Sequence, residues 1–141
     1  MTFYDYLTKE SNKRNIGHIT ENAPNETLKK CKYAVDELEI DPGLIFLDLE
    51  IGHEKGDYSN VEPDIIRLVK QKRSNTENMI NILNREIDND NKLIDKFKKE
   101  QDIDTTEYIN FLEECKKNSE NEYNYLVFLL SKHVDWLKEN S

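Results

Sequence analysis

The chain has 141 residues, of which 29 are acidic and 20 are basic, so its formal charge is −9 at pH 7. This length suffices for one ordinary domain, or for a small domain with an elongated appendage, and it excludes two independent catalytic domains. The acid excess extends over both halves of the sequence, so neither half offers the clustered Lys and Arg that phosphate binding needs. We therefore expect no direct binding of nucleic acid.

Cysteine usage and apolar runs bear on the location of the protein. Cys31 and Cys115 are far apart in the sequence and have no CxxC spacing, which is typical of small buried residues in a reducing compartment. No stretch approaches the roughly 18 apolar residues that a membrane span needs, and the N-terminus lacks the pattern of a secretory signal. We expect a cytoplasmic protein without membrane contact. The abundance of Asn, Lys, Ile and Glu is associated with AT-rich bacterial and phage genomes.

The first 40 residues predict two helices. The aromatic opening FYDYL (residues 3–7) indicates a short amphipathic helix or an aromatic plug for the larger core. The segment NETLKKCKYAVDELEI (residues 25–40) predicts a helix of about 14 residues, with Asn25 available as its N-cap. Its apolar face contains Leu28, Cys31, Val35 and Leu38.

Residues 44–51, LIFLDLEI, fit either a strand or a helix, because periodicity does not separate the two in so short a run. As a helix, the segment would be capped by Asp41, begin at Pro42 and end at Gly52. We favour the helix, because a strand needs a partner and only residues 15–20 could supply one. A loop is expected over residues 52–60.

Residues 61–141 carry two long apolar stripes with the alternating steps of three and four residues that are typical of a coiled coil. The first stripe begins with Pro63 in the first helical turn, where proline is tolerated. Its members are Ile66, Val69, Arg73, Thr76, Ile80, Leu83, Ile87, Asp90, Ile94 and Phe97. The second stripe comprises Tyr108, Leu112, Cys115, Ser119, Glu122, Leu126, Leu129, His133 and Trp136.

Between the stripes lies the polar stretch QDIDTTE (residues 101–107), in which Asp104 and Glu107 form a capping-box pattern that predicts a helix start at about residue 104. Two long helices joined by a short connection usually pack antiparallel. The expected fold is therefore all-α: a small helical N-terminal part, residues 1–60, packed on a long antiparallel two-helix hairpin, residues 61–141. Folding at about residue 102 would bring Phe97 near Tyr108. A hairpin buries only a narrow stripe on each helix, so we also expect a homodimer.

Five polar residues lie in or near the seam between the stripes: Arg73, Asp90, Ser119, Glu122 and His133. Long polar side chains at the edge of a seam commonly reach water or pair locally. The alternative is a polar layer that fixes the register, with Arg73 bonded to His133 or Asp135 and Asp90 bonded to Ser119.

The last helix also carries an aromatic series that is a candidate interaction surface. Tyr125 and Phe128 lie off the main stripe, and aromatic side chains in such positions often dock a partner. Packing in the core is the alternative role. The series consists of Tyr123, Tyr125, Phe128 and Trp136.

No group of residues has the spacing of a catalytic, cofactor or metal site. The crowded run that starts at His53 lacks a second histidine at helical spacing, and His18 has no identifiable orienting partner. His133 lacks the nearby glycine that phosphoryl approach would need. With four glycines in the chain, no Gly-rich phosphate loop can be formed. We expect a protein that is not an enzyme and binds no cofactor or metal.

The functional hypothesis is a non-catalytic protein–protein interaction module: an adaptor, an immunity-type protein or an inhibitor, acting on a basic partner such as a nucleic-acid enzyme. A first alternative is a helical oligomer that binds a small ligand or nucleotide at a subunit interface. Its site would draw on Arg67, Arg73, Arg85 and Tyr123. A second alternative is a phosphotransfer or metal enzyme that uses His133 or the His53 segment.

Overall fold

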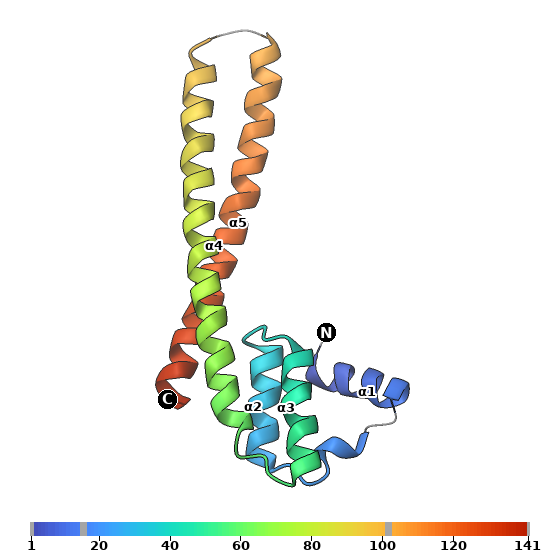
Figure 1. Ribbon diagram of the computed structural model, residues 1–141. Helices are drawn as coiled ribbons and strands as arrows, with labels where there is room; N and C mark the ends of the chain where they lie inside the picture. The colour runs from blue at the N-terminus through green and yellow to red at the C-terminus, as the bar shows by residue number, and fades with distance from the viewer. Residues whose placement is uncertain (1, 15–16, 101–102, 141) are drawn as a thin grey trace. The chain divides into compact units, whose positions relative to one another are not determined.

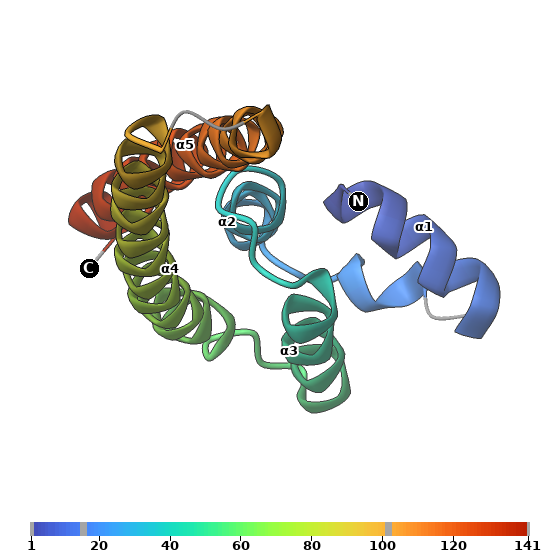
Figure 2. The same cartoon turned by 90° about the horizontal axis from the view of Figure 1, so that it is seen from above.

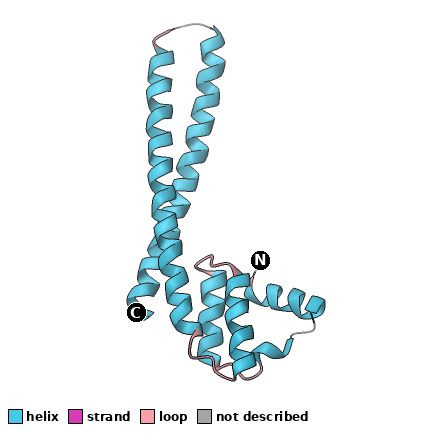
Figure 3. Cartoon of the chain, in the orientation of Figure 1, coloured by secondary structure: helices cyan, strands magenta, loops and turns pink. Residues whose placement is uncertain are grey.

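The computed structural model describes residues 2–14, 17–100 and 103–140. It contains five α-helices and one 3₁₀ helix, and no strand occurs within these ranges (Figure 3). The predicted all-α class is confirmed, with α4 and α5 packed against each other as a hairpin. The elements are α1 (Phe3–Arg14), η1 (Gly17–Thr20), α2 (Asn25–Asp36), α3 (Pro42–Lys55), α4 (Val61–Lys98) and α5 (Ile103–Asn140).

The chain forms two compact units. Unit 1 comprises residues 1–73 and 132–141, and unit 2 comprises residues 74–131. Both long helices run through both units, so the units divide inside α4 and α5. The predicted division after residue 60 stays a prediction, and it coincides with the start of α4 at Val61.

Unit 1 is built around one apolar core. Helix α1 packs on α2, α3 and η1, and α2 packs on α3 (Figures 1 and 2). The start of α4 and the end of α5 complete this core, because their apolar side chains join the same buried cluster as Phe3 and Phe46. The residues that α4 and α5 supply are Val61, Ile65, Leu68, Val69, Trp136 and Leu137.

The predicted Asn25 cap of α2 is wrong by one residue. Pro24 occupies the N-cap position with φ −59° and ψ 139°, no side chain caps the helix, and Asn25 is its first residue. The proline ring fixes φ near this value and proline has no N–H to satisfy, so Pro24 can begin the helix without a side-chain acceptor. Helix α2 has 12 residues and ends at Asp36, earlier than expected.

For residues 44–51 the helical alternative is confirmed. Asp41 caps α3 by accepting a hydrogen bond from Gly43 N at 2.9 Å, and Pro42 is the first helical residue. The predicted end at Gly52 and the loop that was to begin there are wrong, because α3 continues to Lys55 and Gly56, with φ 65°, forms the C-cap. Gly52 is instead needed for close packing, since a Cβ at this position would lie 2.6 Å from Cδ1 of Tyr58.

Unit 2 is the antiparallel hairpin of α4 and α5 (Figure 1). Its register is confirmed by the rings of Phe97 and Tyr108, which lie edge to face with centroids 4.9 Å apart. The connecting residues 101–102 and the side chain of Asp104 lie outside the described residues. The expected seam position of Glu122 is wrong, because this residue is exposed and its neighbour Tyr123 is half-buried. An α-helix has 3.6 residues per turn rather than 3.5, so a strict heptad pattern drifts around the helix.

Candidate functional site

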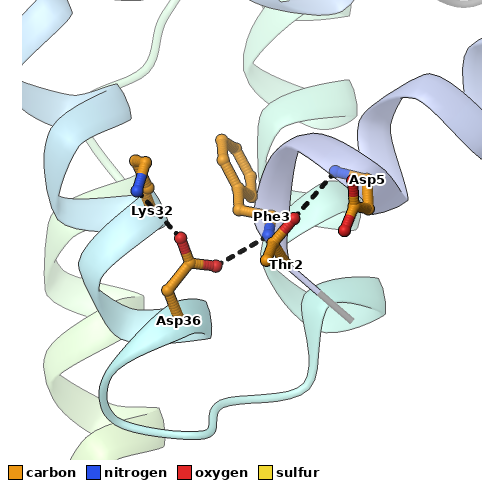
Figure 4. Close-up of polar contacts among 5 residues, drawn as sticks. All are labelled: Thr2, Phe3, Asp5, Lys32 and Asp36. Carbon is orange, nitrogen blue, oxygen red and sulfur yellow. Dashed lines mark hydrogen bonds and ion pairs between the residues drawn. The ribbon is translucent and has the colours of Figure 1, made fainter.

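The best-defined polar site of unit 1 lies where the start of α1 meets the end of α2 (Figure 4). Asp36 Oδ1 accepts a hydrogen bond from Phe3 N at 2.8 Å, and Asp36 Oδ2 pairs with Lys32 Nζ at 3.0 Å. Thr2 Oγ1 accepts from Asp5 N at 3.1 Å and so satisfies a second free N–H of the first turn of α1. Partial burial raises the pKa of Asp36, but the Phe3 N–H and Lys32 outweigh it, so the pKa lies below its usual value. Asp36 is thus an ionised anchor for α1.

An open cavity of about 640 Å³ adjoins this anchor. We call it the acidic cavity, and its lining consists of Thr2, Asp5, Val35, Asp36, Glu37 and Glu39. Four of these six residues are carboxylates. Two lysines pair with members of the set: Lys32 with Asp36, and Lys132 with Glu37 Oε2 at 2.7 Å. The lining is therefore rich in carboxylates, and Asp36 and Glu37 are each paired with a lysine.

A turn after α2 contains Glu39, one of the residues that line the acidic cavity. Glu39 has φ 57°, in the left-handed region that non-glycine residues rarely adopt, and the turn lets Ile40 N donate to Ala34 O at 3.0 Å. The same turn presents the carbonyl oxygen of Leu38 to Nε2 of His133, at 2.9 Å. His133 is fully buried, and burial lowers its pKa even though the Leu38 carbonyl raises it. The end of α5 therefore holds this turn in place.

A second polar cluster joins α3 and α4. Asp48 lies beside Asp64, whose Oδ1 accepts from Arg67 Nε at 2.6 Å. Burial, together with the adjacent Asp64 carboxylate, raises the pKa of Asp48 to about 7, whereas the bonds from Asp48 and Arg67 lower that of Asp64. The pair therefore shares one proton near neutral pH.

The cysteine next to this cluster is in an unreactive state. Cys31 is fully buried, and burial, followed by the negative charges of Asp48 and Glu62, raises the pKa of its thiol to about 12. The thiolate is the nucleophilic form, so this side chain is chemically inert at neutral pH. Cys115, on α5, is half-buried.

The four residues of the predicted aromatic surface do not share one environment. In unit 2, Tyr125 is 50% exposed and Phe128 is 58% exposed, while Tyr123 is half-buried. Trp136 is only 7% exposed and belongs to the core of unit 1. Trp136 therefore has the alternative, core role that its position allowed.

Of the predicted polar residues, Arg73 and His133 belong to unit 1, and Asp90 and Ser119 belong to unit 2. His133 bonds to the Leu38 carbonyl, and the positive charge of Arg73 is close enough to lower the pKa of His133 further. Asp90 and Ser119 are half-buried in unit 2, and a bond between them stays a prediction. The side chain of His18 lies outside the described residues. His53 lies within α3 rather than in the expected loop.

Among the described residues, no three His, Cys, Asp or Glu side chains are grouped so that they could hold a metal ion. Of the helices described, none combines the length and apolar character that a bilayer-spanning segment requires.

The acidic cavity was not predicted from the sequence, although one signal was present. Asp36 and Glu37 end α2, and its last turn contains no basic residue. Carboxylates at a helix C-terminus are opposed by the helix dipole. Their presence there indicates that something other than helix stability favours them.

No protein-family model matches the chain, and no curated protein or solved structure shows significant similarity to it.

Proposed function

We propose that the protein is a non-catalytic interaction module that binds a basic protein through the acidic cavity of unit 1. The observation that carries this proposal is the set of four carboxylates, Asp5, Asp36, Glu37 and Glu39, that line one cavity. Two of them stand at the end of α2, where the helix dipole disfavours them.

A cationic protein side chain fits the cavity better than an apolar ligand does. The cavity is open, and its lining contains Val35 as the single apolar residue. Small-molecule sites are mostly apolar and enclosed, whereas Lys and Arg side chains reach into open acidic recesses. The net charge of −9 would attract a basic partner over longer range and raise the association rate.

The state of the reactive side chains favours binding over catalysis. The Cys31 thiol has a pKa of about 12, and His133 is fully buried. Within the interaction class, the acidic balance favours an adaptor, an immunity-type protein or an inhibitor whose target is basic, such as a nucleic-acid enzyme. The free thiols Cys31 and Cys115 are compatible with a reducing cytoplasm as its location.

The experiment compares the wild type with two charge-reversal variants. One variant replaces two cavity carboxylates, Asp5→Lys and Glu39→Lys. The matched control, Glu21→Lys with Glu54→Lys, changes the net charge equally at two exposed sites of unit 1 outside the cavity lining. Proteins captured from a bacterial lysate by the tagged wild type are identified, and each purified candidate is titrated calorimetrically against all three chains.

We expect one basic protein to bind the wild type and the control with similar affinity. The cavity variant should bind at least tenfold more weakly, and affinity should fall with added salt. A partner that binds the cavity variant as well as the control does would show that the proposal is wrong.

A further inference from the structure

Unit 2 exposes more large apolar side chains than it buries. Among its described residues, seven large apolar side chains are exposed and five apolar side chains are buried. An isolated two-helix hairpin with so small a core is poorly supported, because helical stability comes mostly from packing of an apolar face. Burial of the exposed apolar side chains against another surface would therefore stabilise unit 2.

Most of these exposed residues belong to one flank of the hairpin. Met79, Phe111 and Tyr125 each stand immediately before a seam residue, namely Ile80, Leu112 and Leu126. In an antiparallel helix pair, positions of this type on the two helices lie on the same side of the seam.

Two more exposed residues extend this flank. Ile82 and Phe128 follow Met79 and Tyr125 by three residues, so they neighbour them on the helix surface. We call the five residues Met79, Ile82, Phe111, Tyr125 and Phe128 the apolar flank. Their exposed fractions range from 42% to 59%.

The opposite flank is charged. Lys98 and Lys116 each stand immediately after a seam residue, and they pair with Glu113 at 3.6 Å and with Glu120 at 3.9 Å. The hairpin thus carries these two ion pairs on one side and the five residues of the apolar flank on the other.

The register divides the apolar flank into one cluster of four residues and the single residue Phe111. Phe97 of α4 contacts Tyr108 of α5, and the two helices run antiparallel. A residue of α4 and a residue of α5 therefore lie at the same level along the hairpin when their numbers add up to about 205. Met79 and Ile82 are then level with Tyr125 and Phe128, and Phe111 lies near the other end of unit 2. The positions between the cluster and Phe111 are polar: Glu86, Asn89, Asn118 and Asn121.

We propose that the apolar flank binds the same flank of a second copy of this chain, antiparallel, so that the two hairpins form a four-helix bundle. A twofold axis through the polar middle would place Tyr125 and Phe128 of one copy on Phe111 of the second copy. Phe111 would then meet Tyr125 of the second copy, and Asn118 would meet Asn118 of the second copy. Such self-complementarity is what a twofold interface requires, and paired Asn side chains can fix its register.

The size of the flank agrees with this occupant. The helical segments of unit 2 are about 40 Å long at 1.5 Å per residue, and two helices about 10 Å apart present a face about 20 Å wide. The whole side of unit 2, polar middle included, therefore covers about 800 Å², which is the area that each partner contributes to a standard stable interface.

The test is the mass of the full chain in solution, measured by light scattering after size-exclusion chromatography. The wild type should have twice the 16.7 kDa of one chain. Phe111→Glu with Tyr125→Glu should give a monomer that keeps its helical circular dichroism. The control, Val127→Glu, also adds charge at an exposed apolar position, but off the apolar flank, and it should remain a dimer.

A cysteine placed on the proposed axis tests the orientation without perturbing the apolar flank. In a Cys115→Ser background, Asn118→Cys should form a disulfide-linked dimer on mild oxidation, whereas Glu120→Cys on the charged flank should not. A wild type that is monomeric, alone or with a different protein bound, would overturn the proposal. So would a dimer that survives the double Glu variant, or one in which Asn118→Cys fails to cross-link.

Discussion

His133 donates a hydrogen bond from Nε2 to the backbone carbonyl oxygen of Leu38, at 2.9 Å and across 95 residues of sequence. A carbonyl oxygen can only accept, so Nε2 carries the ring proton. Nδ1 is also buried, and no hydrogen-bond partner for it occurs in the part of the chain that the structure describes. The neutral tautomer is therefore the form that unit 1 accommodates, and protonation of Nδ1 would bury a charge.

This geometry predicts that His133 makes unit 1 less stable in acid. Burial lowers its folded pKa below the ordinary 6.5, so the unfolded chain binds a proton that the folded chain excludes. The contribution of neutral His133 to the free energy of unfolding is complete above pH 6.5, and it is lost as the pH falls below that value. Lys72 and Arg73 add to the shift, and Glu39 opposes it.

The variant His133→Gln keeps an N–H donor for the Leu38 carbonyl and cannot titrate. At pH 7.5 it should be less stable than the wild type by about 1 kcal/mol, because glutamine fills the site less well. At pH 5 this difference should shrink or reverse. Urea unfolding at both pH values measures it, in an Asp48→Asn background so that the second titrating group is silent. An equal difference at the two pH values would contradict the prediction.

Asp48 should have the opposite effect on stability. Its folded pKa of about 7 lies above the ordinary 3.8, so the folded state holds a proton that the unfolded state releases. The contribution of protonated Asp48 to the free energy of unfolding is complete below pH 3.8, and it declines as the pH rises through about 7.

Asp48→Asn should remove that decline, because the amide donates to Asp64 at any pH. The variant should match the wild type at pH 4 and exceed it by about 1–2 kcal/mol at pH 8, an amount reduced by the partial exposure of the site. Urea midpoints across this range measure the effect. Glu54→Gln, an exposed carboxylate of the same helix, is the control that should leave the pH profile unchanged.

Gly52 should not tolerate a side chain while Tyr58 is present. A Cβ at residue 52 would lie 2.6 Å from the Tyr58 ring, so Gly52→Ala should lower the free energy of unfolding by about 1–3 kcal/mol through overpacking. Shortening the neighbour, as in Gly52→Ala with Tyr58→Val, should recover part of that loss relative to Tyr58→Val alone. Gly56→Ala is a useful comparison, because nothing lies within 4 Å of its Cβ and its φ of 65° makes the loss conformational. Tyr58→Val should not reduce the loss of stability caused by Gly56→Ala. If it reduced the losses at Gly52 and Gly56 equally, the steric role of Tyr58 at Gly52 would be contradicted.

The long helices could be predicted because their apolar residues recur at steps of three and four over many turns, and a repeated pattern reports burial directly. The N-terminal cap of α3 could also be predicted, since Asp41 and Pro42 act within a few residues of sequence. Gly52 was misread as a helix end, because its reason for being glycine is the ring of Tyr58, which no local pattern reveals.

The polar sites depend on contacts between distant segments. The stripe places His133 at a seam position, yet its bond is to a carbonyl in the turn after α2. The acidic cavity requires Asp5 from α1 beside the acids that follow Val35, and only the packing of α1 on α2 brings them together. Local periodicity contains no information on either arrangement.

The discontinuity of unit 1 has a consequence for protein synthesis. Residues 132–141 supply His133, Trp136 and Leu137 to a unit that otherwise consists of residues 1–73. The core of unit 1 is therefore completed only after all of unit 2 has been synthesised, because Trp136 and Leu137 follow unit 2 in the chain.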